Sequence, residues 1–144
     1  MSAAERLGYS GAPPTGPGIW VSLSKITDDS LSDELFNKWY NEVHVRDVLN
    51  TGLITKAYRF KNKNPKADRP YLAIYICPDM SVLGGEKMKS IPMTSDLLPA
   101  GKSCHDLASF DTRFYSTTQE ILKEEIKQKG LSVDCSSGGW VLIG

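Results

Sequence analysis

The pattern of hydrophobic and polar positions is strongest between Leu31 and Gly52, where apolar side chains recur at every third or fourth position. This spacing places the apolar side chains on one face of an amphipathic helix. Ser32 is the predicted N-cap, and acidic residues follow it in the first turn, where the helix dipole favours negative charge. Gly52 is a natural helix stop. The predicted apolar face consists of Leu35, Phe36, Trp39, Tyr40 and Val43.

Four stretches alternate between hydrophobic and more polar residues, and this period of two predicts β-strands. The stretches are residues 19–25, 54–60, 70–77 and 106–115. Glycine and proline residues interrupt the segment before the last strand, so only short helical pieces are expected there, near 80–90 and 94–98. The predicted order is strand, helix, strand, strand, short helices, strand. This is the split βαβ order of an α+β fold with a four-stranded antiparallel sheet.

The predicted sheet has helices for only one of its two faces. We expect the helices to pack on aliphatic and phenylalanine side chains, namely Ile19, Val21, Leu23, Leu72, Ile74, Ile76, Phe110 and Phe114. The other face is rich in aromatic and polar side chains, namely Trp20, Tyr58, Tyr71, Tyr75, Tyr115, Ser22, Ser24, Ser109, Asp111 and Arg113. A large aromatic patch is unfavourable in water. It therefore predicts a partner sheet or a ligand on that face.

The chain divides into a central domain and two flanking segments. Residues 19–116 carry all four predicted strands and form the domain. Residues 1–18 are rich in Ala, Gly, Pro and Ser, and we expect a flexible N-terminal tail there. Residues 117–144 are expected to form a C-terminal helix and tail.

Two features of the C-terminal segment carry structural expectations. Thr117 opens a sequence with the spacing of a capping box, so a helix should begin there and end at Gly130. The short apolar run 140–143 could add an edge strand, to this subunit or to another.

Composition narrows the functional classes. The chain has 17 basic and 17 acidic side chains, which argues against a protein that binds nucleic acid or an anionic membrane. Its three cysteines are too widely spaced for a disulfide framework or a C-x-x-C metal pair. No apolar run has the length of a signal peptide core or a membrane span, so we expect a cytoplasmic protein. Two histidines without a clustered carboxylate pair argue against a metal site.

His44 is the leading candidate for chemistry. It follows Tyr40 by four residues and precedes Asp47 by three, so all three share one side of the predicted helix. An imidazole exchanges a proton near neutral pH, which suits a general acid or base, and Asp47 could orient its ring. The alternative is a packed structural histidine whose ring bonds a carbonyl oxygen or Asp47. The residues alone leave both interpretations open.

Six further residues are predicted to bind a substrate: Trp20, Ser22, Tyr58, Tyr75, Asp111 and Arg113. Tyrosine and tryptophan rings stack on flat molecules while their O–H and N–H groups donate hydrogen bonds. A hydroxyl from Tyr40, Tyr58 or Tyr75 could polarise a carbonyl group. Asp111 and Arg113 alternate on one strand and therefore point into the same space. They form either a structural ion pair or a site where Arg113 clasps a ligand carboxylate.

The helix motif F-x-x-W-Y-x-x-x-H, from Phe36 to His44, is followed by Asp47 and the apolar pair Val48 and Leu49. Together with the later stretches PYLAIY, SDLLP and FDTRFY, it resembles fungal members of the EthD-like family in the dimeric α+β barrel (ferredoxin-like) superfamily. The resemblance implies a ferredoxin-like βαββαβ domain that forms a homodimer through its sheet face around an internal pocket. It also implies cofactor-free reactions of carbonyl-rich, often aromatic molecules.

We therefore expect a cofactor-independent lyase or cyclase that uses His44 as general acid and base. Its substrate would be a small aromatic or polyketide-like carbonyl compound, and its reaction a decarboxylation, an aldol-type cyclisation or a dehydration. The alternatives are a cofactor-free or haem-dependent monooxygenase and a non-catalytic ligand-binding or stress-related barrel. The expected partners are the small-molecule substrate and a second copy of the chain, with no nucleic acid and no membrane.

Overall fold

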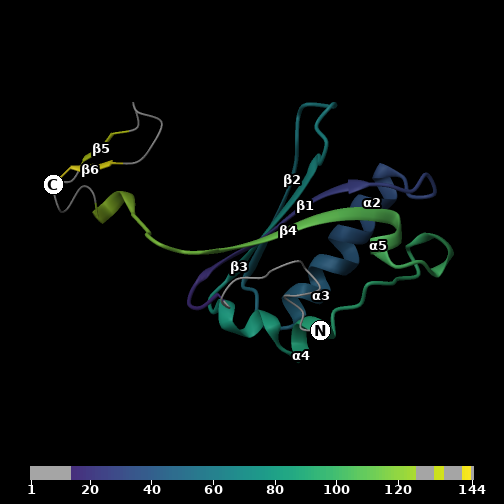
Figure 1. Cartoon of the computed structure of the whole chain (residues 1–144), viewed down its shortest axis with the longest axis horizontal. Coiled ribbons are helices and arrows are strands. Elements are labelled where there is room, and N and C mark those ends of the chain that lie inside the picture. Colours follow the sequence, from purple (N-terminus) through teal and green to yellow (C-terminus); the bar gives the residue numbers. More distant parts are fainter. Residues whose placement is uncertain (1–13, 126–131, 135–140, 144) are drawn as a thin grey trace.

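A four-stranded antiparallel sheet is the centre of the computed structural model, which describes residues 14–125, 132–134 and 141–143 (Figure 1). The strands lie in the order β2-β3-β1-β4. Their bounds are Gly18–Ile26 for β1, Lys56–Lys61 for β2, Tyr71–Cys77 for β3 and Ala108–Ser116 for β4. The predicted α+β class and the four-stranded antiparallel sheet are thus confirmed, and β1 lies between β3 and β4 as the split βαβ order requires.

The predicted first helix is present, and its two ends are where the local signals place them. It consists of α2 (Asp33–Trp39), a π-turn η1 (Tyr40–His44) and α3 (Val45–Asn50). The Ser32 hydroxyl accepts a hydrogen bond from the Leu35 N–H at 3.1 Å, which confirms the N-cap. Gly52 has a φ of 77°, a left-handed conformation that ends the helix. These helices cover one face of the sheet (Figure 1).

The connection between β3 and β4 contains only short helical pieces. They are the 3₁₀ turns η2 (Met80–Gly84) and η3 (Pro99–Gly101) and the helices α4 (Glu86–Lys89) and α5 (Cys104–Leu107). The piece predicted near 80–90 is present as η2 and α4, whereas residues 94–98 contain no helix. The predicted fourth strand also starts too early, because α5 occupies residues 104–107. The Ser103 hydroxyl accepts a hydrogen bond from the His105 N–H and so caps this helix.

The predicted assignment of the two sheet faces is wrong for β1 and β3, whose rows must be exchanged. It is right for β4, where Phe110 contacts Phe36 of α2 and Arg113 lies on the opposite face. The helices pack on the aromatic row, because Phe36 of α2 meets Tyr71 edge-to-face with ring centroids 4.9 Å apart. Trp20 and Tyr75 belong to the same row and are buried. Leu72, like its outward-facing neighbours in β3, is only half-buried. Both rows of β3 are hydrophobic, so alternation separates them without revealing which one the helices cover.

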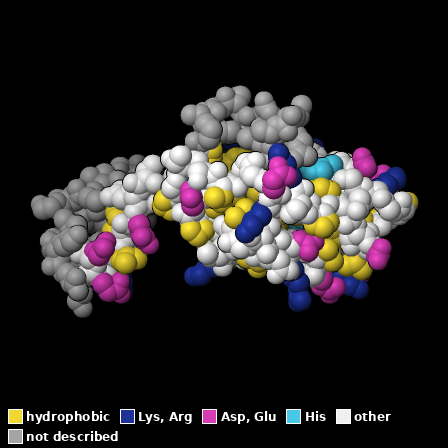
Figure 2. Space-filling model, turned by 90° about the horizontal axis from the view of Figure 1, so that it is seen from below, with side chains coloured by type: hydrophobic (Ala, Val, Ile, Leu, Met, Phe, Trp, Pro, Cys, Tyr) yellow, Lys and Arg dark blue, Asp and Glu magenta, His cyan; other side chains and the backbone are white. Residues whose placement is uncertain are grey.

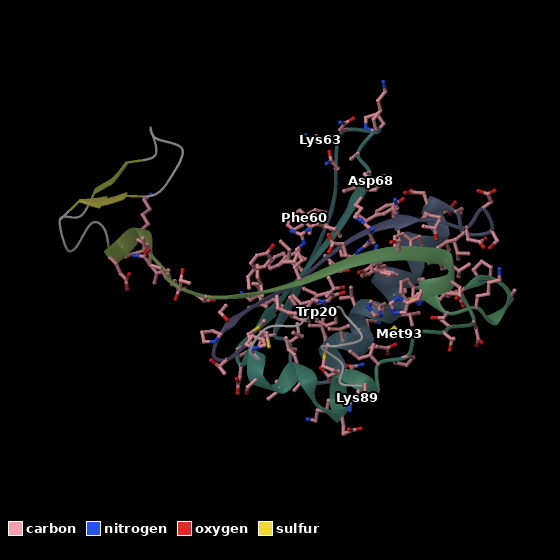
Figure 3. The ribbon with its side chains drawn as sticks, viewed as in Figure 1. Trp20, Phe60, Lys63, Asp68, Lys89 and Met93 are labelled. Carbon is pink, nitrogen blue, oxygen red and sulfur yellow. The ribbon has the colours of Figure 1, made fainter. Side chains whose placement is uncertain are left out.

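The opposite face of the sheet, here called the outer face, is apolar along β1 and β3, bears Asp111 and Arg113 on β4, and carries no helix among the described residues. Strand register aligns its side chains in three rows, which run Tyr115–Ile19–Ile76, Val21–Ile74–Tyr58 and Leu23–Leu72–Phe60. Tyr58, Phe60 and Tyr115 are about half exposed. Phe60 lies on the side of the sheet away from α3, whereas Trp20 lies on the side toward it (Figure 3).

The C-terminal segment differs from its prediction. Residues 117–122 have no regular structure, and helical conformation begins only at Lys123, so no helix opens at Thr117. The predicted end at Gly130 lies outside the described residues. The apolar run instead contributes β6 (Val141–Ile143), which pairs with β5 (Ser132–Asp134) in a two-stranded sheet apart from the main one (Figure 1).

The N-terminal tail is described only from residue 14 onward, and residues 1–13 lie outside the description. The last residues before β1 are tied to the domain by backbone hydrogen bonds. Gly16 accepts from the Met80 N–H at 2.7 Å, and Pro17 accepts from the Thr117 N–H at 2.8 Å.

Candidate active site between helix and sheet

The π-turn in the first helix places two side chains against the sheet. In η1 the Val45 N–H donates to the carbonyl of Tyr40, five residues earlier, instead of four as in an α-helix. Such turns are rare and often occur at functional sites. Tyr40 and His44, at the two ends of the turn, are both buried. Hydrophobic spacing gave no sign of this turn, because spacing of three and four residues fits an uninterrupted helix equally well.

His44 is enclosed by aromatic rings and lacks a hydrogen bond at one nitrogen. Its imidazole stacks on the Trp39 ring with centroids 4.8 Å apart and meets the Tyr40 ring edge-on at 5.2 Å. Its Nδ1 atom is buried and has no hydrogen-bond partner in the part of the chain that the structure describes. The sequence suggested that Asp47 could bond the ring and orient it, but no such bond reaches Nδ1.

Burial is the main cause that lowers the pKa of His44 from 6.5 to about 4, with smaller effects from the positive charges of His105 and Arg59. The imidazole is therefore neutral at pH 7, and a neutral imidazole can accept a proton or a hydrogen bond. His105, the second histidine of the chain, is an exposed residue of α5.

The sheet supplies hydroxyl and indole groups to the same interior. The Trp20 and Tyr75 rings pack with centroids 4.5 Å apart. Burial raises the pKa of Tyr75 well above its usual value, and Tyr40 raises it further. Burial also raises the pKa of Tyr40, against the lowering influence of Tyr75 and Ser22. Both phenols thus keep their protons and are potential hydrogen-bond donors.

Arg59 of β2 completes this group, and sequence reasoning missed it. Its guanidinium lies over the Tyr40 ring, 4.1 Å from the centroid, and its Nη1 donates to Asn41 Oδ1 at 2.8 Å. Its Nε is buried and has no hydrogen-bond partner among residues 14–125, 132–134 and 141–143. Because Arg59 pairs with Ala73 of β3, it belongs to the helix-facing row of the sheet. That position followed from the alternation of β2, once the covered face of the sheet was known.

Trp20, Ser22, Tyr40, His44, Arg59 and Tyr75 are together called the interior polar cluster. Among the described residues, five buried side-chain polar atoms lack a protein partner: Trp20 Nε1, Ser24 Oγ, His44 Nδ1, Arg59 Nε and Tyr75 Oη. Four of these atoms belong to the cluster, and Ser24 lies two residues from Ser22 on the same face of β1. Leaving such an atom unpaired costs about 1–3 kcal/mol, so native proteins rarely tolerate it. This concentration indicates a place where a bound molecule or water supplies the missing partners.

Three residues predicted to bind substrate do not join the cluster. Asp111 and Arg113 lie on the outer face, where they form an ion pair of 3.0 Å between Oδ2 and Nη2. Tyr58 also lies there and stacks on Phe60 with centroids 6.4 Å apart. All three lie on the face away from the helices, as the sequence predicted, whereas Trp20, Ser22 and Tyr75 lie on the helix-facing side. Of the predicted binding residues, Ser22 and Tyr75 influence the pKa of Tyr40, and Trp20 packs on Tyr75.

A comparison of the sequence with known proteins points to one relative with a descriptive name. The chain is 43% identical over 86 residues to Core atranone cluster (CAC) protein 1 of Stachybotrys chlorohalonatus. The aligned part is 59% of this chain and 36% of that protein, so the chain spans about a third of the relative's length. No family model and no solved structure matches the chain. The resemblance to the EthD-like family therefore stays a prediction.

The described residues hold no group of three or more His, Cys, Asp or Glu side chains arranged to bind a metal ion. Within the same residues, no helix is both long and apolar enough to cross a membrane. On the face shown in Figure 2, Lys and Arg side chains alternate with Asp and Glu side chains and do not form a basic patch.

Proposed function

We propose that this chain acts in secondary metabolism as a cofactor-independent lyase or cyclase on an aromatic or polyketide-like carbonyl compound. The observation that carries the proposal is the unpaired Nδ1 of a neutral, buried His44 beside other unpaired polar groups. The relative named as a core atranone cluster protein supports the metabolic setting. The resemblance to the EthD-like family supports the class of reaction.

The chemistry assigned to the cluster is proton transfer next to a carbonyl group. His44 Nδ1 takes a proton from the carbon beside the carbonyl, and the electron pair of the broken C–H bond moves onto the carbonyl oxygen. The hydroxyl groups of Tyr40 and Tyr75 donate hydrogen bonds to that oxygen and stabilise the enolate. The enolate then attacks a second carbonyl or expels a β-hydroxyl group. Because the pKa of His44 is low, the imidazolium returns its proton readily, either to the new alkoxide or to the departing hydroxide.

We also propose that two copies of the chain pair through their outer faces, as the family resemblance implies. The three apolar rows of that face, with about half-exposed Tyr58, Phe60 and Tyr115, support this pairing. An uncovered patch of this kind is a typical contact surface. The sheet-to-sheet dimer expected from the sequence is thus retained, but through the aliphatic face instead of the aromatic one.

Substitution of His44 tests the proposed reaction. Purified wild-type protein, His44→Gln and His105→Gln are incubated with a panel of polyketide-like β-dicarbonyl and aromatic acid compounds, and products are identified by mass spectrometry. We expect His44→Gln to fold and to lose at least about a hundredfold in rate, the usual contribution of a general base. His105→Gln is the matched control, and it should keep most of the wild-type rate. Full turnover by His44→Gln would show that His44 is not the proton-transfer residue.

One observation favours a second candidate function. A histidine with a pKa of about 4 is a weak base, and it serves well as a neutral hydrogen-bond partner. The interior polar cluster then binds an aromatic ligand without converting it. Saturable binding of a panel compound by a wild-type protein that forms no product from any of them supports this function over the lyase.

A further inference from the structure

We infer that Arg59 forms an anion subsite at the border of the interior polar cluster, and that the natural ligand carries an ionised carboxylate there. This inference rests on the proposed function, because it names the substrate class of the same site. It concerns a residue that sequence reasoning had not selected.

The first step is the charge balance of Arg59. A half-buried guanidinium normally has a carboxylate partner, because removing an unpaired charge from water is costly. None of the carboxylates in the described residues lies within ion-pair distance of Arg59. The charge of Asp33 influences the pKa of Arg59, but its carboxylate already pairs with Lys61 at 3.0 Å and accepts a hydrogen bond from the Tyr71 hydroxyl. Within the described residues, the positive charge of the guanidinium thus has no carboxylate of its own.

The second step is the geometry of the guanidinium. Nη1 is held by Asn41 and the flat face is held by the Tyr40 ring, so the orientation of the group is fixed. Nε, which has no partner, lies on the guanidinium edge that clasps carboxylates with two parallel hydrogen bonds. A fixed, unpaired edge of this kind selects a planar anion such as a carboxylate over a neutral amide.

The third step is the position of Arg59 relative to the other groups. Strand β2 is an edge strand, so Arg59 lies between the cluster and solvent. Its charge influences His44, and its guanidinium contacts the Tyr40 ring directly. A ligand whose carboxylate sits on Arg59 therefore places its adjoining ring beside Tyr40 and His44. An aromatic or polyketide acid has the required shape and charge.

Arg113 provides an internal contrast. It is also an arginine on a strand, but Asp111 neutralises it through a salt bridge of 3.0 Å, and it lies on the outer face. Among the described residues, Arg113 thus has a carboxylate partner and Arg59 has none, and the two lie on different faces of the same sheet. Removing either changes the net charge equally, so Arg113 is the matched control.

Ligand binding tests the subsite without requiring turnover. The probes are 2,4-dihydroxybenzoate and its neutral counterpart 2,4-dihydroxybenzamide, titrated at pH 7 by calorimetry into wild-type protein, Arg59→Gln, Arg59→Lys and Arg113→Gln. We expect wild-type protein and Arg113→Gln to bind the acid about tenfold more tightly than the amide, which corresponds to one good charged hydrogen bond. Arg59→Gln should bind both probes alike. Arg59→Lys keeps the positive charge but not the paired N–H donors of the guanidinium, so it should retain only part of the preference for the acid. If Arg59→Gln does not fold, the comparison of Arg59→Lys with wild-type protein is the test.

Several results overturn the inference. The inference is wrong if wild-type protein does not bind the acid, or binds it no better than the amide. It is also wrong if the preference for the acid survives in both Arg59 variants, or if Arg113→Gln loses that preference to the same extent as Arg59→Gln. The failure of the proposed reaction is distinguishable from these results. Acid binding that depends on Arg59 without product formation keeps the subsite and refutes the reaction, whereas turnover that depends on His44 without acid preference refutes the subsite alone.

Discussion

The buried imidazole of His44 makes the stability of the fold depend on pH in a predictable direction. The folded-state pKa of about 4 lies below the ordinary value of 6.5. Between these values the unfolded chain binds a proton at this position and the folded chain does not. Stability from this residue is therefore fully present above pH 6.5 and is lost as the pH falls toward 4. Replacing His44 by Gln, which is neutral at every pH, should remove this part of the pH dependence.

The two pKa values determine the size of the effect. The difference between 6.5 and about 4 corresponds to about 3 kcal/mol of unfolding free energy once the pH is below both values. At pH 5, about 2 kcal/mol of this is already lost. The carboxyls of Asp28, Asp33 and Asp79 have lowered pKa values and contribute mainly at lower pH. They are also common to both proteins, so they cancel when the two are compared.

Urea unfolding followed by tryptophan fluorescence measures the effect at pH 7.5, 6.0 and 5.0. Wild-type protein should lose about 2 kcal/mol more than His44→Gln between pH 7.5 and pH 5.0. The control His105→Gln removes the exposed histidine and should keep most of the wild-type dependence. If His44→Gln loses as much stability as wild-type protein over this range, His44 is protonated in the folded state and its assigned environment is wrong.

Two further predictions concern packing and assembly. Gly18→Ala should destabilise the protein by about 1–3 kcal/mol in urea unfolding, because a Cβ atom there would lie 2.3 Å from the Tyr115 carbonyl oxygen. The control Gly84→Ala, whose Cβ atom would have no neighbour within 4 Å, should cost less stability, and equal losses would contradict the close approach at Gly18. In sedimentation velocity, wild-type protein should be a dimer, and Phe60→Glu should raise the dimer dissociation constant at least tenfold. Lys63→Gln, which changes the net charge equally, should leave that constant unchanged, and a monomeric wild-type protein would refute pairing through the outer face.

Local signals in the sequence predicted the elements well, because short-range chemistry determines them. The hydroxyl of Ser32 and the left-handed conformation of Gly52 fix the ends of the first helix, and both are recognisable from residue type. The antiparallel sheet followed from alternation in the same way. Even the position of His44 on the inward side of the helix followed from its spacing to Tyr40.

The site could be predicted only in part, because it depends on which sheet face the helices cover. In β3, Leu72 and Tyr71 belong to opposite rows that are both hydrophobic, and only three-dimensional packing decides between them. The wrong assignment of the β1 and β3 rows grouped Arg113 with Trp20 and Tyr75 and left Arg59 out of the site. The π-turn was also beyond reach, since a hydrogen bond between Val45 and Tyr40 has no counterpart in residue spacing.

The π-turn between Tyr40 and His44 holds one residue more than a turn of α-helix. Deleting one residue there would therefore restore an ordinary helix while the turns on either side keep nearly the same orientation. A homologue one residue shorter could still carry tyrosine and histidine on the side that faces the strands, because positions three apart share one side of an α-helix. A gap of one residue in this short stretch would thus not by itself separate relatives that share the chemistry from those that share only the scaffold.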